Sequence, residues 1–349
     1  MMKYFTGSYI VTAIGLLLAY IWGEHVHIGS GFECIFIALV LSILEISLSF
    51  DNAVVNAARL EKMSPKWQHR FLTWGIIIAV FGMRFLFPIL VVSIFANVGL
   101  VEVAKMAISD ADRYAHYLHV SHPPIITFGG TFLMMLFFSY FFNSQKDIHW
   151  IKVLEEKISH FGDFKGIQVV LTLFALYVMQ NFLPEATRLE VVIAGIWGVM
   201  VYLLIDGLTH MLDKHGQNLP SSHCGSGLGL KSSCFAGFLY LELIDASFSL
   251  DGVLGAFALS KDILIITIGL SIGAMFVRSL TIMLVEKKTL TQYIYLEHGA
   301  HWAIGALSAI MLFSAVHEVP EVVTGLLGLG FIIAAFISSL IHNKRQSML

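Results

Sequence analysis

The chain has 349 residues, of which 57% are hydrophobic and 13% are charged. That is about half the charged fraction of a typical soluble domain, and with a mean hydropathy of +0.79 the composition excludes a water-soluble globular protein. The net charge of −3 comes from 21 basic and 24 acidic residues, so no basic excess favours nucleic acid as a partner. We therefore expect an all-α polytopic protein whose main partner is the lipid bilayer.

Ten apolar runs are long enough to be membrane-spanning helices of about 17 residues or more. The first has the outline of a signal peptide, but no A-x-A-like cleavage site follows it, so we expect it to remain as the first span. The runs lie near 8–22, 32–57, 72–96, 124–142, 166–183, 190–210, 233–258, 262–285, 297–316 and 321–341.

The basic residues test this count. Alternating the connections between the two sides of the bilayer places 15 of the 21 basic residues on one side and four on the other, and leaves Arg84 and Arg278 inside spans. A miscounted span would scramble this asymmetry. Because Lys and Arg favour cytoplasmic loops, the pattern predicts a multi-pass protein of a bacterial inner (plasma) membrane with both termini in the cytoplasm.

The cytoplasmic connection 143–165 mixes apolar residues with Lys and Glu. This pattern is consistent with a short amphipathic helix on the inner membrane surface and equally with an ordinary loop.

Spans 2 and 7 contain an internal repeat. The segment 47–51, Ser-Leu-Ser-Phe-Asp, recurs 200 positions later as 247–251, Ser-Phe-Ser-Leu-Asp. Another acid, Glu45 or Asp245, precedes each final aspartate by six residues, and the next span of each copy holds one arginine. The repeat divides the chain into residues 1–185 (spans 1–5) and 186–349 (spans 6–10). An odd number of spans per copy predicts two inverted five-helix repeats, as in many secondary transporters.

Spans 2 and 7 also hold the acids Glu45, Asp51, Glu242, Asp245 and Asp251, and ionisable groups inside a bilayer are rare and usually functional. In span 2, helical spacing places Glu45, Ser49, Asn52 and Asn56 on one stripe and Ser47 and Asp51 on another. Helices that are polar on two faces belong at the centre of a bundle. Neither span has a proline near its aspartate, so we expect both to be continuous.

Clustered carboxylates with hydroxyl and amide groups offer the hard oxygen ligands that Mn²⁺, Mg²⁺ and Ca²⁺ prefer. Crowded carboxylates in a low dielectric also hold protons when no cation is present, so we expect a divalent cation, as cargo and not as a bound cofactor, to exchange with protons. The arginines would be counter-ions of the empty site, although a plain structural ion pair is an equal alternative. The predicted ligands are Glu45, Ser49, Asp51, Asn52, Glu242, Asp245, Ser249 and Asp251, with Arg84 and Arg278 as counter-ions.

Weaker candidates lie near the ends of other spans, where solvated or interfacial roles are at least as well supported. They are Asp112, His116, His119 and His122 in the outer connection, Asp206 and His210 in span 6, Glu297, His298 and His301 in span 9, and His317, Glu318 and Glu321 outside.

The acid-rich segments 45–55 and 245–254 resemble those of the TerC superfamily of integral membrane proteins, relatives of the LysE-type exporters. The likeness extends over about 31–341. The resemblance implies manganese export or related metal homeostasis at the acids and the amide of these segments, which are Glu45, Asp51, Asn52, Asp245 and Asp251.

The leading hypothesis is thus a proton-coupled exporter of divalent cations, with Mn²⁺ as the expected cargo. One alternative keeps the fold but moves a small organic or amino-acid substrate, as LysE relatives do. Another is a non-transporting membrane factor that loads metal onto other proteins. An enzyme is not expected, because the spans contain no G-x-G-D, H-E-x-x-H or Ser/His pair. The sequence leaves the oligomeric state open.

Overall fold

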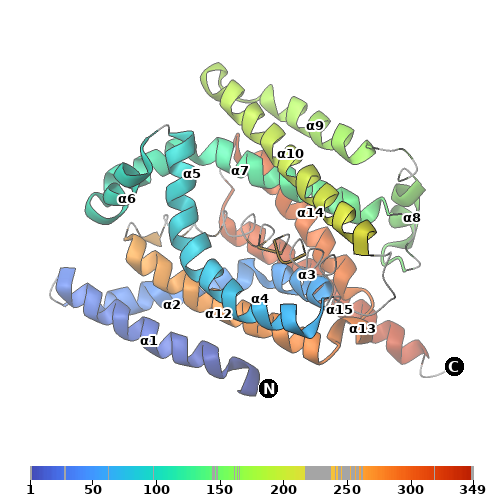
Figure 1. Ribbon diagram of the computed structural model, residues 1–349, viewed down its shortest axis with the longest axis horizontal. Helices are drawn as coiled ribbons and strands as arrows, with labels where there is room; N and C mark the ends of the chain where they lie inside the picture. The colour runs from blue at the N-terminus through green and yellow to red at the C-terminus, as the bar shows by residue number, and fades with distance from the viewer. Residues whose placement is uncertain are drawn as a thin grey trace.

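Every element in the described part of the chain is helical (Figure 1). The computed structural model describes residues 2–26, 29–61, 63–96, 98–143, 146, 148–160, 162, 164, 166–216, 237–239, 241–242, 245, 252, 256, 259–260, 262–317 and 319–346. The elements are α1 (Met2–Val26), α2 (Gly31–Leu48), α3 (Phe50–Leu60), α4 (Pro65–Ile77), the π-helix η1 (Ile78–Leu86), α5 (Phe87–Phe95), α6 (Leu100–Ser109), α7 (Ala111–Phe141), α8 (Lys152–His160), α9 (Ile167–Gln180), α10 (Glu185–Gly216), α12 (Ile263–Glu286), α13 (Thr289–Gln292), α14 (Leu296–Ser314) and α15 (Glu321–Gln346).

Six of the described helices are long and apolar enough to cross a membrane, namely α1, α2, α7, α10, α12 and α15. They define a multi-pass membrane protein, as the composition indicates. Helices α7 and α12 are central, with two-thirds of their apolar windows buried, whereas α1 is peripheral with 17% buried. In Figure 1, α1 runs beside α12 along one edge, and α9 and α10 pair on the opposite edge.

The other four predicted spans do not correspond to one long apolar helix of this kind in the described residues. Run 166–183 corresponds to α9, whose 14 residues are fewer than the roughly 20 that a span needs. Run 297–316 corresponds to α14, which is 19 residues long and begins with polar residues. Most of run 233–258 lies outside the described residues. The count of ten spans therefore remains a prediction.

The second predicted span is not continuous, so that expectation was wrong. Helix α2 ends at Leu48, and α3 begins at Phe50 after Ser49 departs from helical geometry at φ −102° and ψ 14°. The break contains no proline, and the backbone hydrogen bonds from Ser49 N–H to Glu45 and from Ala53 N–H to Ser49 are kept across it. The Ser49 hydroxyl donates to the Glu45 carboxylate one turn earlier. Broken helices at membrane depth commonly form ligand sites.

The third predicted span, 72–96, is interrupted as well. It consists of α4, η1 and α5, and η1 is a nine-residue π-helix that contains Arg84. In Figure 1 the chain changes direction between α4 and α5. Long π-helical stretches are rare, and they occur mostly at functional sites.

The connection after the third span is also more helical than predicted. Residues 111–123 extend α7 beyond its predicted start at 124, and the Asp110 side chain caps the new N-terminus by accepting from the backbone N–H of Arg113. In the connection 143–165, residues 152–160 form the short helix α8.

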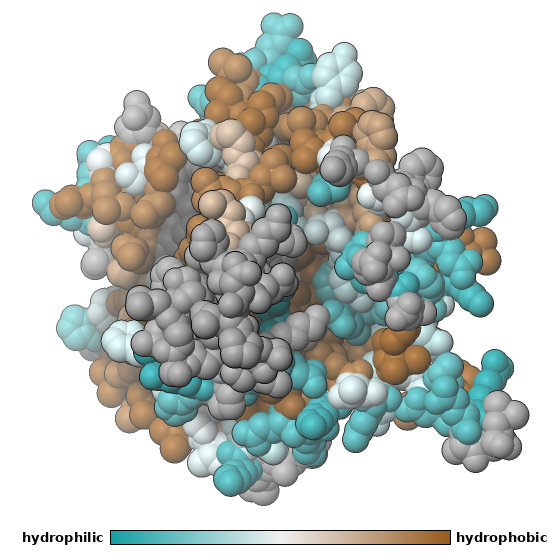
Figure 2. Space-filling model, turned by 45° about the vertical axis from the view of Figure 1, so that its right-hand side comes forward, coloured by the Kyte–Doolittle hydropathy of each residue, from teal (hydrophilic) through white to brown (hydrophobic). Residues whose placement is uncertain are grey.

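The outer surface fits a lipid environment. Large apolar side chains such as Phe32, Leu204 and Leu326 are 64–74% exposed, which water would disfavour. Figure 2 shows this apolar surface (brown) concentrated toward the top and left of one face, with hydrophilic surface (teal) toward the lower right. Inside, the largest apolar cluster joins α3, α7, α10 and α14 through residues such as Phe132, Tyr202 and Ile304.

Candidate functional site

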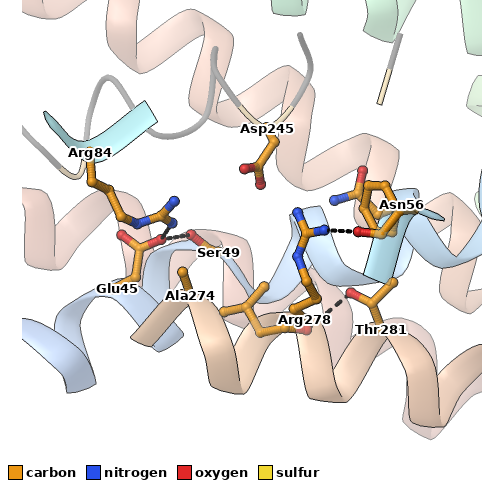
Figure 3. Close-up of a pocket in the computed structure, with 10 residues that line it drawn as sticks. Glu45, Ser49, Asn56, Arg84, Asp245, Ala274, Arg278 and Thr281 are labelled. Atoms are coloured by element: carbon orange, nitrogen blue, oxygen red, sulfur yellow. Dashed lines mark hydrogen bonds and ion pairs between the residues drawn. The ribbon is translucent and has the colours of Figure 1, made fainter. Parts of the chain in front are cut away.

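A small buried cavity lies beside the break between α2 and α3 (Figure 3). Its volume of about 10 Å³ is roughly that of one water molecule or one bare ion. The walls come from the broken second span, the third span, α12 and Asp245. The lining residues are Glu45, Ser49, Asn56, Phe71, Arg84, Asp245, Ala274, Val277, Arg278 and Thr281.

A buried ion pair closes one end of this cavity. Nη2 of Arg84 lies 2.5 Å from Oε1 of Glu45, and the two side chains are only 3% and 1% exposed. The same carboxylate oxygen accepts from the Ser49 hydroxyl at 2.9 Å. Nε of Arg84 donates to the carbonyl oxygen of Leu270 at 3.1 Å. A buried charge pair survives only when its remaining donors and acceptors are satisfied, and these bonds meet that need.

Asp245 lies between the two guanidinium groups (Figure 3). Its Oδ1 accepts a hydrogen bond of 2.7 Å from the side-chain amide of Asn52 on α3. Its Oδ2 is buried and has no hydrogen-bond partner. The structure thus joins the acid of the predicted seventh span to the polar stripe of the second.

The second arginine is held differently at the other end of the cavity. Nη1 of Arg278 donates to the carbonyl oxygen of Phe71, and the guanidinium carbon lies 4.2 Å from the centre of that residue's ring. Gly75 provides the room for this arrangement, because a Cβ atom there would overlap Arg278 and come within 2.6 Å of Oε1 of Glu242.

In the described part of this region, five side-chain oxygens are buried without a hydrogen-bond partner. Nearly all buried polar atoms in proteins have a partner, so each exception needs an explanation. Carboxylate and amide oxygens can all accept, and a cation or a hydrogen-bond donor would satisfy them. The five atoms are Oδ1 of Asn52, Oδ1 of Asn56, both carboxylate oxygens of Glu242 and Oδ2 of Asp245.

The remaining predicted ligands lie elsewhere. Asp51 is buried on the opposite side of α3, and its Oδ2 faces Gly328 of α15. Ser249 and Asp251 lie outside the described residues. Among the described residues, no three His, Cys, Asp or Glu side chains are close enough together to hold a metal ion. Any cation in this cavity would therefore need amide and hydroxyl oxygens in addition to carboxylates.

The weaker candidates do not gather into one site. On α7, Asp112, His116 and His119 are exposed and His122 is half-buried, while Asp206 is half-buried on α10 and His317 is exposed after α14. The side chains of His210 and Glu321, and all of Glu318, lie outside the described part of the structure.

The N-terminal end of α14 carries a second buried cluster, whose acid was not predicted. Glu155 of α8 is 1% exposed and accepts from Nδ1 of His298 at 2.9 Å and from Nε1 of Trp302 at 3.0 Å. Burial raises the pKa of Glu155, but these hydrogen bonds outweigh it and lower the pKa to about 2. The nearby ring of His301 stacks on Tyr140 with 3.5 Å between centroids. These contacts attach the connection 143–165 to α14, and the Glu155 carboxylate has hydrogen-bond partners.

Sequence reasoning missed Phe71, Gly75 and Glu155. Phe71 acts through its backbone carbonyl and its ring, and Gly75 acts through its small size. Residue type alone does not reveal either role. Asn56 was on the predicted polar stripe but was not among the predicted ligands, although the i, i+4, i+7, i+11 spacing from Glu45 pointed to it.

The fold and the site define a multi-pass helical membrane protein with a buried, charged cavity among its helices. The chain belongs to a family described as "Protein of unknown function (DUF475)", which matches residues 50–346. The resemblance to the TerC superfamily was wrong, because the family comparison gave this family and no TerC match. It rested on two short acid-rich segments, which are too little to separate families of polytopic proteins. No curated protein and no solved structure matches the sequence.

Proposed function

We propose that the protein is a transporter that exports a divalent metal cation across a membrane in exchange for protons. One observation carries the proposal: a buried cavity is bordered by acids and amides, several of whose oxygens have no hydrogen-bond partner. Leaving such groups unsatisfied in a membrane interior is costly, so their retention favours a functional role.

The chemistry of the cavity favours a small, hard cation. Its candidate ligands are carboxylate, amide and hydroxyl oxygens, which suit Mn²⁺, Mg²⁺ and Ca²⁺. Its volume of about 10 Å³ is large enough for one ion but too small for an amino acid. The organic-substrate alternative therefore needs a much larger opening of the bundle than the cation proposal does.

Proton exchange follows from the buried acids. Glu242 and Asp245 are both buried, and a bound cation would neutralise their charge. A cation that enters would displace protons from these acids, because metal binding requires deprotonated ligands.

We further propose that the helices form two inverted five-helix repeats, with ten spans in all. A reciprocal contact supports this proposal. Asn52 binds Asp245, and the residue equivalent to Asn52, Gly252, lies beside Glu45, the equivalent of Asp245. A Cβ atom at Gly252 would be 3.0 Å from Oε2 of Glu45. A two-fold axis in the membrane plane would exchange these two contacts.

The orientation proposal rests on the distribution of lysine and arginine, which places both termini in the cytoplasm of a bacterial inner membrane. Helix α8 would then lie at the cytoplasmic surface. Exposed apolar side chains in and beside it, including Val153 at 72% and Phe164 at 63%, support contact with the lipid interface.

The test is the total cellular content of manganese, magnesium and calcium after a manganese challenge, in a host that lacks its own exporter. We expect cells with the wild-type protein to contain less manganese than cells with Glu45→Gln/Asp245→Asn at equal membrane abundance. The matched control is Glu102→Gln/Asp112→Asn, which removes two exposed acids and should behave like wild type.

Other outcomes separate the alternatives. A change in cellular amino acids without a change in any metal would favour the organic substrate. Unchanged metal and amino-acid contents, together with Mn²⁺ binding by the purified protein, would favour the metal-loading factor.

A further inference from the structure

We infer that Arg84 is an internal competitor for the transported cation, and that the π-helical segment η1 is the element that withdraws it. With η1 in its π-helical form, the guanidinium contacts the Glu45 carboxylate. When η1 rewinds to α-helix, Arg84 leaves and Glu45 becomes available as a ligand. The inference rests on the proposed function, because it assigns a role to a residue of the same cavity.

The contact between Arg84 and Glu45 is the first observation. The guanidinium contacts Oε1 of Glu45 at 2.5 Å, the same oxygen that accepts from Ser49. That oxygen is therefore fully engaged, whereas Oδ1 of Asn56 and Oδ2 of Asp245 in the same cavity have no partner. A cation can use the latter two directly, but it can use Oε1 of Glu45 only after Arg84 leaves.

The second observation is the geometry of the helix that holds Arg84. The residue lies within η1, whose hydrogen bonds run from residue i to i+5, against i to i+4 in an α-helix. A shift between these two patterns turns the side chains of the segment about the helix axis. Because η1 has ordinary α-helix on both sides, such a shift can change the direction of Arg84 without unfolding the span.

Pro88 disfavours the α-form of the turn that contains Arg84. It is the second residue of α5, four positions after Arg84. In α geometry a proline ring clashes with the carbonyl of the residue four positions earlier, which here is residue 84. The sequence therefore disfavours the α-form at the position of the buried arginine, which favours the contact of Arg84 with Glu45.

Arg278 provides a matched comparison within the same cavity. It is a second buried arginine, but it lies on the regular helix α12 and is held by the carbonyl and the ring of Phe71. Its guanidinium does not occupy Glu45. The inference therefore distinguishes the two arginines: removal of Arg84 should free a ligand, and removal of Arg278 should not.

The test is calorimetric titration of Mn²⁺ into the purified full-length protein in lipid nanodiscs at pH 7. We expect Arg84→Gln to bind Mn²⁺ at least tenfold more tightly than wild type, while Arg278→Gln binds no more tightly than wild type. Arg84→Lys retains a competing cation and should stay close to wild type. A merely structural role for Arg84 predicts weaker binding on its removal.

A second variant keeps the arginine and alters only the helix. Pro88→Ala removes the ring that clashes with the carbonyl of residue 84 in α geometry, so it should favour the α-form and tighten Mn²⁺ binding at least tenfold with Arg84 in place. Pro124→Ala, in the interior of α7, is the control for replacing a membrane proline, and it should leave the affinity unchanged.

Each failure has a distinct meaning. If wild type binds Mn²⁺ but neither Arg84→Gln nor Pro88→Ala binds it more tightly, the competitor role is overturned and the proposed function stands. If Arg278→Gln tightened Mn²⁺ binding equally, the competitor role would also be overturned, because the effect would not be specific to Arg84. If wild type binds none of Mn²⁺, Mg²⁺ and Ca²⁺, the cation proposal and this inference both fail.

Discussion

The side-chain amide of Asn52 donates a 2.7 Å hydrogen bond to Oδ1 of Asp245, joining α3 to the predicted seventh span across 193 positions of sequence. Both side chains are at least nine-tenths buried. Within the described part of the chain, this amide is the hydrogen-bond donor to the Asp245 carboxylate, so it helps to fix that carboxylate at the cavity wall.

Asn52→Ala should therefore destabilise the protein by about 1–3 kcal/mol, the usual cost of leaving a buried acceptor unpaired. Thermal unfolding in detergent would measure the change. The control is Asn181→Ala, because the Asn181 amide is exposed and bonds only within its own helical turn; a change within about 0.5 kcal/mol is expected there. Equal effects in the two variants would refute the role of the Asn52 bond.

The pair of Glu45 and Arg84 should be strongly coupled. Removing one charge leaves the other buried and unpaired, which typically costs about 3–5 kcal/mol. Removing both avoids that penalty. In a double-mutant cycle, Glu45→Gln/Arg84→Gln should be less destabilised than the sum of the single variants, by roughly 0.5–3 kcal/mol.

An exposed pair serves as the matched cycle. Arg113 and Glu102 lie 3.6 Å apart and are 51% and 58% exposed, so their coupling should be about 1 kcal/mol or less. If the coupling energy of the buried pair were no larger than that of this exposed pair, the prediction would be contradicted.

Gly75→Ala should disturb the second arginine. The added methyl group would overlap Arg278 and crowd Glu242, and overpacking of this kind costs about 1–3 kcal/mol. Loss of Mn²⁺ binding should accompany the loss of stability. Gly207→Ala in α10 meets nothing within 4 Å, so it should be neutral or stabilise the helix by about 0.5–1 kcal/mol. If neither variant changed the free energy of unfolding, Arg278 would accommodate the added methyl group without cost, and the prediction would be wrong.

The stability contributed by Glu155 should depend on pH. Its pKa is about 2 in the folded protein against an ordinary 4.5. A lowered folded-state pKa gives stability that is present above pH 4.5 and is lost as the pH falls toward 2. Wild type should therefore unfold at a higher temperature than Glu155→Gln at pH 7, and the difference should shrink between pH 4.5 and the lowest accessible pH. Glu156→Gln, at an exposed neighbouring position, should show no such trend.

Hydropathy predicted the helices more reliably than their interruptions. The runs 8–22, 190–210 and 321–341 each lie within one long helix, since an apolar segment in lipid must satisfy its own backbone hydrogen bonds. The break at Ser49 and the π-helix η1 were not predicted, because both lie within unbroken apolar runs and depend on local hydrogen bonding. Pro88 was visible in the sequence, but a proline alone does not distinguish a kink from a π-helix.

The candidate site was predictable to a similar degree. Helical spacing brought Glu45, Ser49 and Asn56 to one stripe, and the structure places all three on the cavity wall. The spacing also separated Asp51 from them, and the structure places it on the far side of α3. Which acid would bind which partner across the bundle was not predictable, since contacts such as Asn52 with Asp245 depend on tertiary packing.

The hydrogen bonds of Glu155 bear on how the predicted halves can move. By sequence this residue belongs to the first half, yet its carboxylate is bound to His298 and Trp302 of the second. If transport requires one half to rock against the other, α8 will travel with the second half. The bending must then be absorbed on both sides of α8, because α7 before it and α9 after it both belong to the first half.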